Sequence, residues 1–128
     1  MSYYFKKEMQ VTFQEAIDKV TEELKKEGFG ILTEIDVKET LKKKLGVDFH
    51  KYRILGACNP PFAYRALMAE PHIGTMLPCN VIVQEMPNDK VEVAAIDPLS
   101  SMQAIANSDL QPIAMEIRAK LKRVIEKL

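Results

Sequence analysis

Residues 53–80, RILGACNPPFAYRALMAEPHIGTMLPCN, decide the fold predicted for this chain. Residues 52–58 alternate along the chain without a helical stripe, which predicts a strand. The triplet NPP that follows predicts a helix over residues 60–69, because proline is tolerated in the first helical turn. A loop then leads to a second predicted strand, residues 78–85. We expect these two strands to lie side by side and antiparallel.

On the N-terminal side of this stretch, two strands and two helices are predicted. Residues 3–9 indicate a strand. Thr12, with a glutamate three residues later, predicts the start of an amphipathic helix that ends at Gly28. Apolar and polar side chains alternate over residues 30–36, which predicts a strand. Residues 37–45, with the sequence VKETLKKKL, predict a helix with a lysine-rich, solvated face.

On the C-terminal side, residues 87–89 predict a turn that leads into a strand over residues 90–96, so that a hairpin forms. Residues 97–107 are expected to be irregular or weakly helical. Ser108 and Gln111 predict a capped start for a long final helix. The predicted buried stripe of that helix consists of Leu110, Ile113, Ile117, Leu121, Val124, Ile125 and Leu128.

This order of elements predicts an α+β fold in a single domain, residues 1–128. The architecture we expect is a two-layer sandwich, in which a mainly antiparallel five-stranded sheet carries two long helices on one face. The other face stays open and leaves Leu32, Ile54, Ile82 or their alternates partly exposed. Exposed apolar area of this kind marks a partner or ligand surface, so we expect a homodimer through the open face.

Charge and composition restrict the partners. The chain has 128 residues, with 18 lysines and arginines against 18 aspartates and glutamates. This balance argues against binding to nucleic acid or to anionic membranes, which normally requires a positive surface. No run approaches the roughly 18 to 20 apolar residues that span a bilayer. We expect a cytoplasmic protein whose two cysteines are reduced thiols.

Cys58, His72 and Cys79 are candidate metal ligands. If the strands that contain the two cysteines pair as predicted, both thiols come close together, and His72 lies on the loop between them. Thiolates and an imidazole are ligand types that zinc prefers, and water, a carboxylate or a second subunit would supply a fourth ligand. The spacing is unlike that of a structural zinc motif, because the three residues are spread over 22 positions.

Cys58 is also the best candidate for reactivity, since it directly precedes a predicted helix. A helix N-terminus lowers the pKa of a thiol below its ordinary value of about 8.5. The alternative interpretation is a buried cysteine that acts as a small hydrophobe. A small ligand near this point would contact Cys58, Asn59, Tyr64 and Arg65.

Four segments resemble a prokaryotic family known as domain of unknown function 302: GFGILTEIDV (residues 28–37), RILGACNPPFAYRAL (53–67), PCNVIVQE (78–85) and VAAIDP (93–98). The resemblance covers almost the whole chain. It implies a compact domain with a TATA-box-binding-protein-like order of strand, helix, four strands and helix. This likeness is one of fold, and it implies neither DNA binding nor an enzymatic activity. The matching positions are Cys58, Asn59, Pro60, Gly74, Pro78, Cys79 and Asp97.

Three functional hypotheses follow. The first, which we favour, is a non-enzymatic binding or interaction domain that forms a homodimer and holds a metal ion or a small ligand near Cys58, His72 and Cys79. The second is a thiol-dependent enzyme or redox sensor that uses Cys58. The third is a domain that binds an apolar metabolite between the sheet and the long helix.

Overall fold

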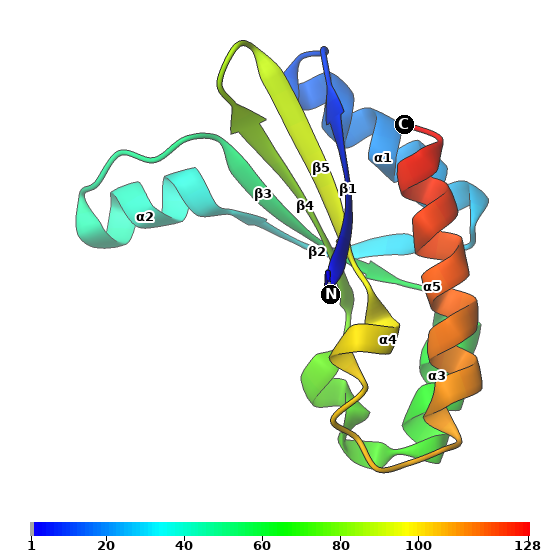
Figure 1. The fold of residues 1–128 in the computed structure, drawn as a ribbon. Helices are drawn as coiled ribbons and strands as arrows, with labels where there is room; N and C mark the ends of the chain where they lie inside the picture. Colours follow the sequence, from blue (N-terminus) through cyan, green and yellow to red (C-terminus); the bar gives the residue numbers. More distant parts are fainter. Residues whose placement is uncertain (1) are drawn as a thin grey trace.

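The computed structural model describes residues 2–128, and Figure 1 shows their arrangement. The strands are β1 (Tyr4–Met9), β2 (Gly30–Asp36), β3 (Tyr52–Cys58), β4 (Cys79–Met86) and β5 (Lys90–Ile96). The helices are α1 (Phe13–Lys26), α2 (Val37–Leu45), α3 (Pro60–Ala69), α4 (Pro98–Ser101) and α5 (Leu110–Glu126), and a 3₁₀ helix, η1 (Pro71–Met76), follows α3. The strands form one antiparallel sheet in the order β1-β5-β4-β3-β2.

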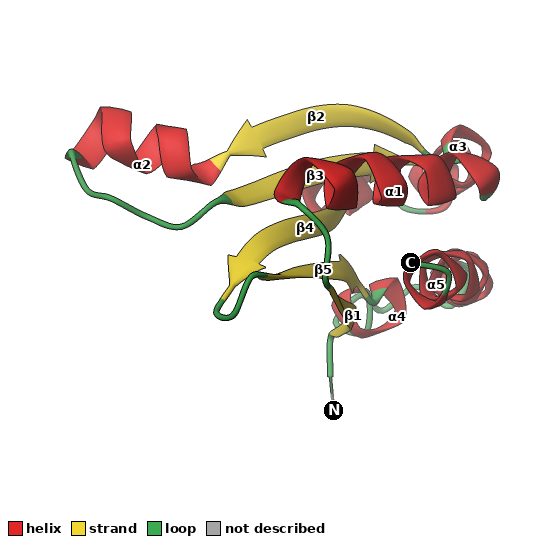
Figure 2. Cartoon of the chain, turned by 90° about the horizontal axis from the view of Figure 1, so that it is seen from above, coloured by secondary structure: helices red, strands yellow, loops and turns green. Residues whose placement is uncertain are grey.

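The two long helices, α1 and α5, lie on the same face of this sheet, as Figure 2 shows. This confirms the predicted α+β sandwich. The first turn of α1 is capped as predicted: the Thr12 hydroxyl accepts from the Glu15 amide at 3.1 Å, and the Glu15 carboxylate accepts from the Thr12 amide at 3.2 Å. The main core lies between the sheet and the two helices. Its helical members include Ala16, Ile17, Val20, Leu24, Ile117, Leu121, Val124 and Ile125.

The pairing of β3 with β4 is antiparallel, as predicted. In its register Ala57 lies opposite Cys79, and Ile54 lies opposite Ile82. Paired residues point to the same face and neighbours along a strand point to opposite faces. The buried residues Leu55, Val81, Val83 and Val93 therefore face the helices. Ile54 and Ile82 face the side of the sheet that the helices leave uncovered.

Gly56 in β3 is a position where a side chain has no room. A Cβ atom there would overlap the Thr33 hydroxyl and would lie 2.7 Å from Pro78 Cγ. Close packing of β2 and of the start of β4 against β3 therefore requires glycine at this point.

Helix α2 extends away from the rest of the molecule, as Figure 1 shows, and none of its residues is buried. This agrees with the predicted solvated helix. Its carboxyl end is formed by Gly46, which has a positive φ of 68°. Within residues 2–128, no helix combines the length and the apolar character needed to cross a membrane.

The start of α5 differs from the prediction. Ser108 does not cap the helix, which begins at Leu110 with Asp109 as its N-cap residue. The Asn107 side chain instead accepts a hydrogen bond from the Asp109 amide at 3.0 Å. This local turn, typical of asparagine, displaces the helix start by one residue.

Candidate functional site

An apolar cavity of about 260 Å³ lies between α3, α5 and the end of the sheet where β3 stops and β4 begins. Its wall takes residues from the main core, such as Ala57 and Ile117, and from a smaller cluster that includes Ala66 and Ile113. The lining residues are Phe29, Leu32, Ala57, Cys58, Asn59, Phe62, Ala63, Ala66, Leu67, Leu77, Pro78, Cys79, Met102, Ile113, Ala114 and Ile117.

Asn59 joins the sheet end of this cavity to α1. Its side-chain amide donates a hydrogen bond to the carbonyl of Glu27 at 3.0 Å, and it makes no cap hydrogen bond to α3. A Cβ atom on Gly28 would approach this amide to 3.1 Å, and Gly28 has a positive φ of 87°. Asn59 therefore fixes the position where α3 leaves the sheet relative to the end of α1. It is also the one amide side chain in the described cavity wall.

Both cysteines contribute to the cavity wall, but they lie on opposite faces of the sheet. Cys79 lies opposite Ala57, so it shares the face of the sheet that packs on the helices. Cys58 follows Ala57, is paired with Gly30, and so lies on the opposite face of β3. Burial, together with the neighbouring Cys58, raises the pKa of the Cys79 thiol to about 11. At neutral pH Cys79 is therefore an uncharged thiol.

His72 does not join the cysteines. It lies in η1 with 92% of its side chain exposed, and its Nδ1 is 3.6 Å from the Glu70 carboxylate. Among residues 2–128, no three side chains of histidine, cysteine, aspartate or glutamate are arranged to hold a metal ion. Of the three predicted metal ligands, the structure thus brings Cys58 and Cys79 to one cavity and leaves His72 outside it. Zinc stays a prediction from ligand type alone.

Tyr64 and Arg65, two of the predicted ligand-binding residues, lie on the outer side of α3. Tyr64 is 67% exposed, and Arg65 pairs with Glu116 of α5 at 3.6 Å. Neither lines the cavity. The inner side of α3 carries Phe62 and Ala66, which sequence analysis did not single out. Their spacing of four residues is the signal that identifies this face.

Asp97, a position matched in the family resemblance, makes contacts that stabilise the fold. It is buried, its carboxylate accepts from the Leu99 amide at 3.1 Å, and it binds Arg118 of α5 at 3.0 Å. Asp97 therefore caps α4 and ties it to α5.

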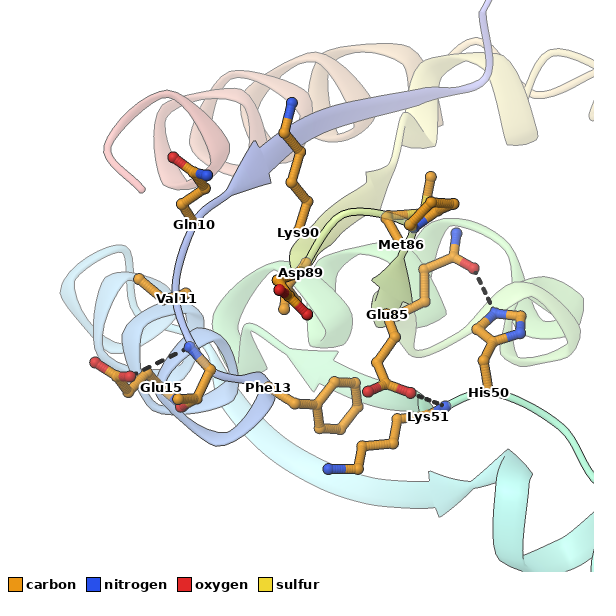
Figure 3. A pocket seen from close by; sticks show the side chains of 14 residues that line it. Gln10, Val11, Phe13, Glu15, His50, Lys51, Glu85, Met86, Asp89 and Lys90 are labelled. Carbon is orange, nitrogen blue, oxygen red and sulfur yellow. Dashed lines mark hydrogen bonds between the residues drawn. The ribbon is translucent and has the colours of Figure 1, made fainter.

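A second hollow, of about 1200 Å³, lies at the opposite end of the sheet and is shown in Figure 3. It is bounded by the loop before α1, the segment before β3 and the β4–β5 hairpin. Its polar groups largely bind one another: the Glu85 carboxylate accepts from the Lys51 amide at 2.9 Å, and His50 Nε2 lies 3.0 Å from Gln84 Oε1. The Phe13 ring is 5.9 Å from Lys51 Nζ. This wide, self-paired surface is a weaker candidate for a ligand site than the apolar cavity.

Comparison with known proteins agrees with this fold. The family described as "Domain of unknown function DUF302" matches residues 5–128. The chain belongs to this family. A crystal structure entitled "Crystal structure of uncharacterized conserved protein DUF302 from Bacillus stearothermophilus" is similar to it, with a TM-score of 0.91 and 29% sequence identity over 99% of this chain and 98% of that one. Among curated proteins, none matches.

Membership of DUF302 confirms the resemblance found in the sequence, and the solved DUF302 structure confirms the sandwich. The finer likeness to the TATA-box-binding protein stays a prediction. The homodimer and the cytoplasmic location also stay predictions.

Proposed function

We propose that this DUF302 domain binds a small, uncharged, apolar molecule in the cavity between α3, α5 and the sheet. The observation that carries the proposal is the cavity itself, about 260 Å³ in volume and walled almost entirely by apolar side chains. Apolar cavities with a few polar groups are typical of small-molecule sites. The proposal combines the third hypothesis from the sequence with the ligand site that the first one expected near Cys58.

The chemistry of the wall supports an uncharged ligand. None of the described lining residues is an aspartate, glutamate, lysine or arginine. The Cys79 thiol is protonated at neutral pH, because burial raises its pKa to about 11. The Asn59 amide already donates a hydrogen bond to Glu27. An ion placed here would lose its hydration and find no opposite charge, which costs many kcal/mol.

The size of the cavity limits the ligand further. A cavity of about 150 Å³ is enough to hold benzene in another protein, and typical ligand pockets begin at about 300 Å³. The volume of about 260 Å³ therefore suits a fused aromatic ring or a medium alkyl chain. Exposed Leu32 and Leu67 belong to the wall, so the cavity has an apolar rim through which such a ligand can enter.

The geometry favours binding over thiol catalysis. His72 is the histidine that the sequence offered as a base for Cys58, and it lies exposed in η1, outside the cavity wall. A nucleophilic cysteine normally needs a base within hydrogen-bonding distance.

Thermal unfolding in the presence of naphthalene and of 1-decanol tests the proposal. A ligand at about 100 times its dissociation constant stabilises the folded state by about 2.7 kcal/mol, so the midpoint should rise with concentration. Decanoate, the charged relative of decanol, should give no shift near neutral pH. If neither neutral probe binds, or if decanoate binds as well as decanol, the proposal is wrong.

A cavity-filling variant and a matched control locate the binding. Ala114 of α5 is buried in the cavity wall, whereas Ala119 of the same helix is exposed. Ala114→Leu should abolish the shift, and Ala119→Leu should keep it. If Ala114→Leu fails to fold, Ala63→Leu fills the cavity from α3, where the site is less tightly packed. Undiminished binding to a folded filled variant would place the probe elsewhere and overturn the proposal.

A further inference from the structure

A third hollow, chemically different from the other two, lies on the face of the sheet that α1 and α5 leave uncovered. Its volume is about 410 Å³, and three tyrosines belong to its wall. Tyr4 stands on β1 and Tyr52 on β3, so aromatic side chains border it from both sides of the β4–β5 pair. Ala94 lies opposite Ile82 in the register, and its short side chain leaves room between longer neighbours.

Two of the three tyrosine rings at this hollow are exposed. Tyr3 and Tyr4 pack edge to face, with ring centroids 5.0 Å apart and an interplanar angle of 72°, and both are exposed. Tyr52 is partly buried. Burial, with smaller effects of Glu92 and Tyr3, raises the pKa of the Tyr52 phenol, so this ring is neutral at physiological pH. The faces of neutral phenol rings are electron-rich and attract cations.

One carboxylate supplies negative charge at the same place. Glu92 belongs to the wall and is only 8% exposed. Its Oε1 accepts a hydrogen bond from Gln84 Nε2 at 3.0 Å, and Gln84 is in turn 3.0 Å from His50 Nε2. Lys6 Nζ lies 3.8 Å from Glu92 Oε2, beyond hydrogen-bonding distance, and its side chain is half exposed. This ion pair with Lys6 lacks a hydrogen bond, so a cation that came closer to the Glu92 carboxylate would interact with it more strongly.

We propose that this hollow binds a small organic ammonium ion. The tyrosine rings that line the hollow would contact its alkyl groups, and Glu92 would balance its charge. An aromatic cage with a carboxylate binds a cation more tightly than a neutral molecule of the same shape, because the tyrosine rings and the carboxylate both attract positive charge. Lys6 is the internal competitor, since a bound cation would replace its long contact with Glu92. The site is separate from the apolar cavity and requires nothing from the function proposed there.

Isothermal titration calorimetry with choline tests this inference. Its neutral isostere, 3,3-dimethyl-1-butanol, has the same shape without the charge. Choline should bind to the wild-type protein at least about tenfold more tightly than the isostere, since each ring and the carboxylate favour the cation. Absence of choline binding, or equal affinity for the two molecules, would overturn the proposal.

Variants assign the binding to the cage. Tyr52→Leu keeps apolar bulk but removes the ring face, and Glu92→Gln removes the charge. Each should weaken choline binding by about tenfold. Lys6→Ala should strengthen it, because the competing cation is gone. Tyr64→Leu, at an exposed tyrosine on α3, is the matched control and should leave the affinity unchanged.

Folding and oligomeric state are checked on the same samples. Circular dichroism shows whether each variant folds, and if Tyr52→Leu does not, Tyr4→Leu at the exposed edge strand gives the same readout. Choline affinity that is unchanged in a folded ring variant would refute the cage. Sedimentation of the wild-type protein shows whether a second copy covers this face, and a dimer that excludes choline would also refute the proposal.

Discussion

Alkaline pH should destabilise this protein through the Cys79 thiol. Burial against the core, together with Cys58, raises the pKa of this thiol from 9.0 to about 11. The unfolded chain loses the thiol proton first, because its thiol keeps the ordinary pKa. Above about pH 9 the unfolded state therefore binds fewer protons than the folded state, and stability falls as the pH rises. The contribution is fully present below about pH 9 and is lost by about pH 11.

The size of this effect follows from the shift. One pKa unit corresponds to about 1.36 kcal/mol, so a shift of about two units amounts to about 3 kcal/mol once both states are deprotonated. Near pH 10 the loss should be about 1 kcal/mol. Lysines and tyrosines titrate in the same range, so the wild-type curve alone does not isolate the thiol.

The assay is urea unfolding of the wild-type protein and of Cys79→Ala between about pH 8 and pH 10.5. At the lower pH values the variant should be less stable than the wild type by a fixed amount, because a partly buried side chain is shortened. Its disadvantage should then shrink by about 1 kcal/mol as the pH reaches 10. If the two free energies of unfolding fall in parallel over the whole range, the thiol is not buried as described and the reasoning is refuted.

Two further predictions concern the residues that hold the fold together. Gly56→Ala should destabilise the protein by about 2 kcal/mol, because its Cβ meets Thr33 and Pro78; a denaturation midpoint equal to that of the wild type would contradict this packing. Glu27→Gln should cost about 1 kcal/mol near neutral pH, since the hydrogen bond from Arg123 holds the pKa of Glu27 below 4.5. That stability is present above about pH 4.5 and is lost as the pH falls through the lowered pKa of Glu27. The urea midpoints of variant and wild type should therefore approach each other on acidification, and a constant difference would contradict the linkage.

The main helices could be predicted because their signals are local. The capping box at Thr12 and the apolar stripe of α1 lie within one element, and both agree with the structure. The stripe of α5 was predicted for the same reason. Its start was not, because Ser108 and Asn107 both offer side-chain oxygens for a turn. The choice of Asn107 depends on its amide, which also binds the carbonyl of Ala69 at 2.8 Å.

The candidate site could be predicted only in part. Cys58, Asn59 and Cys79 do reach one cavity, because the pairing of β3 with β4 brings their positions together. Tyr64 and Arg65 were chosen on α3 by residue type, and the helix directs them outward. The inner face of α3 carries Phe62 and Ala66, whose spacing of four residues is a local signal, but only the packing of α3 on α5 shows that this face lines a cavity.

The sequence by itself determined most of the helices and strands, because periodicity and caps act between residues close along the chain. The order of these elements also led to the expectation, confirmed by the structure, that β3 and β4 pair antiparallel. The tertiary structure alone decided that a cavity remains beside these cysteines and that three tyrosines line a hollow with Glu92 on the other face. A cavity is the space that packed elements fail to fill. The face of the sheet on which a side chain lies depends on the strand register, because a shift of one residue turns the side chain to the other face. Both depend on contacts between residues far apart in sequence.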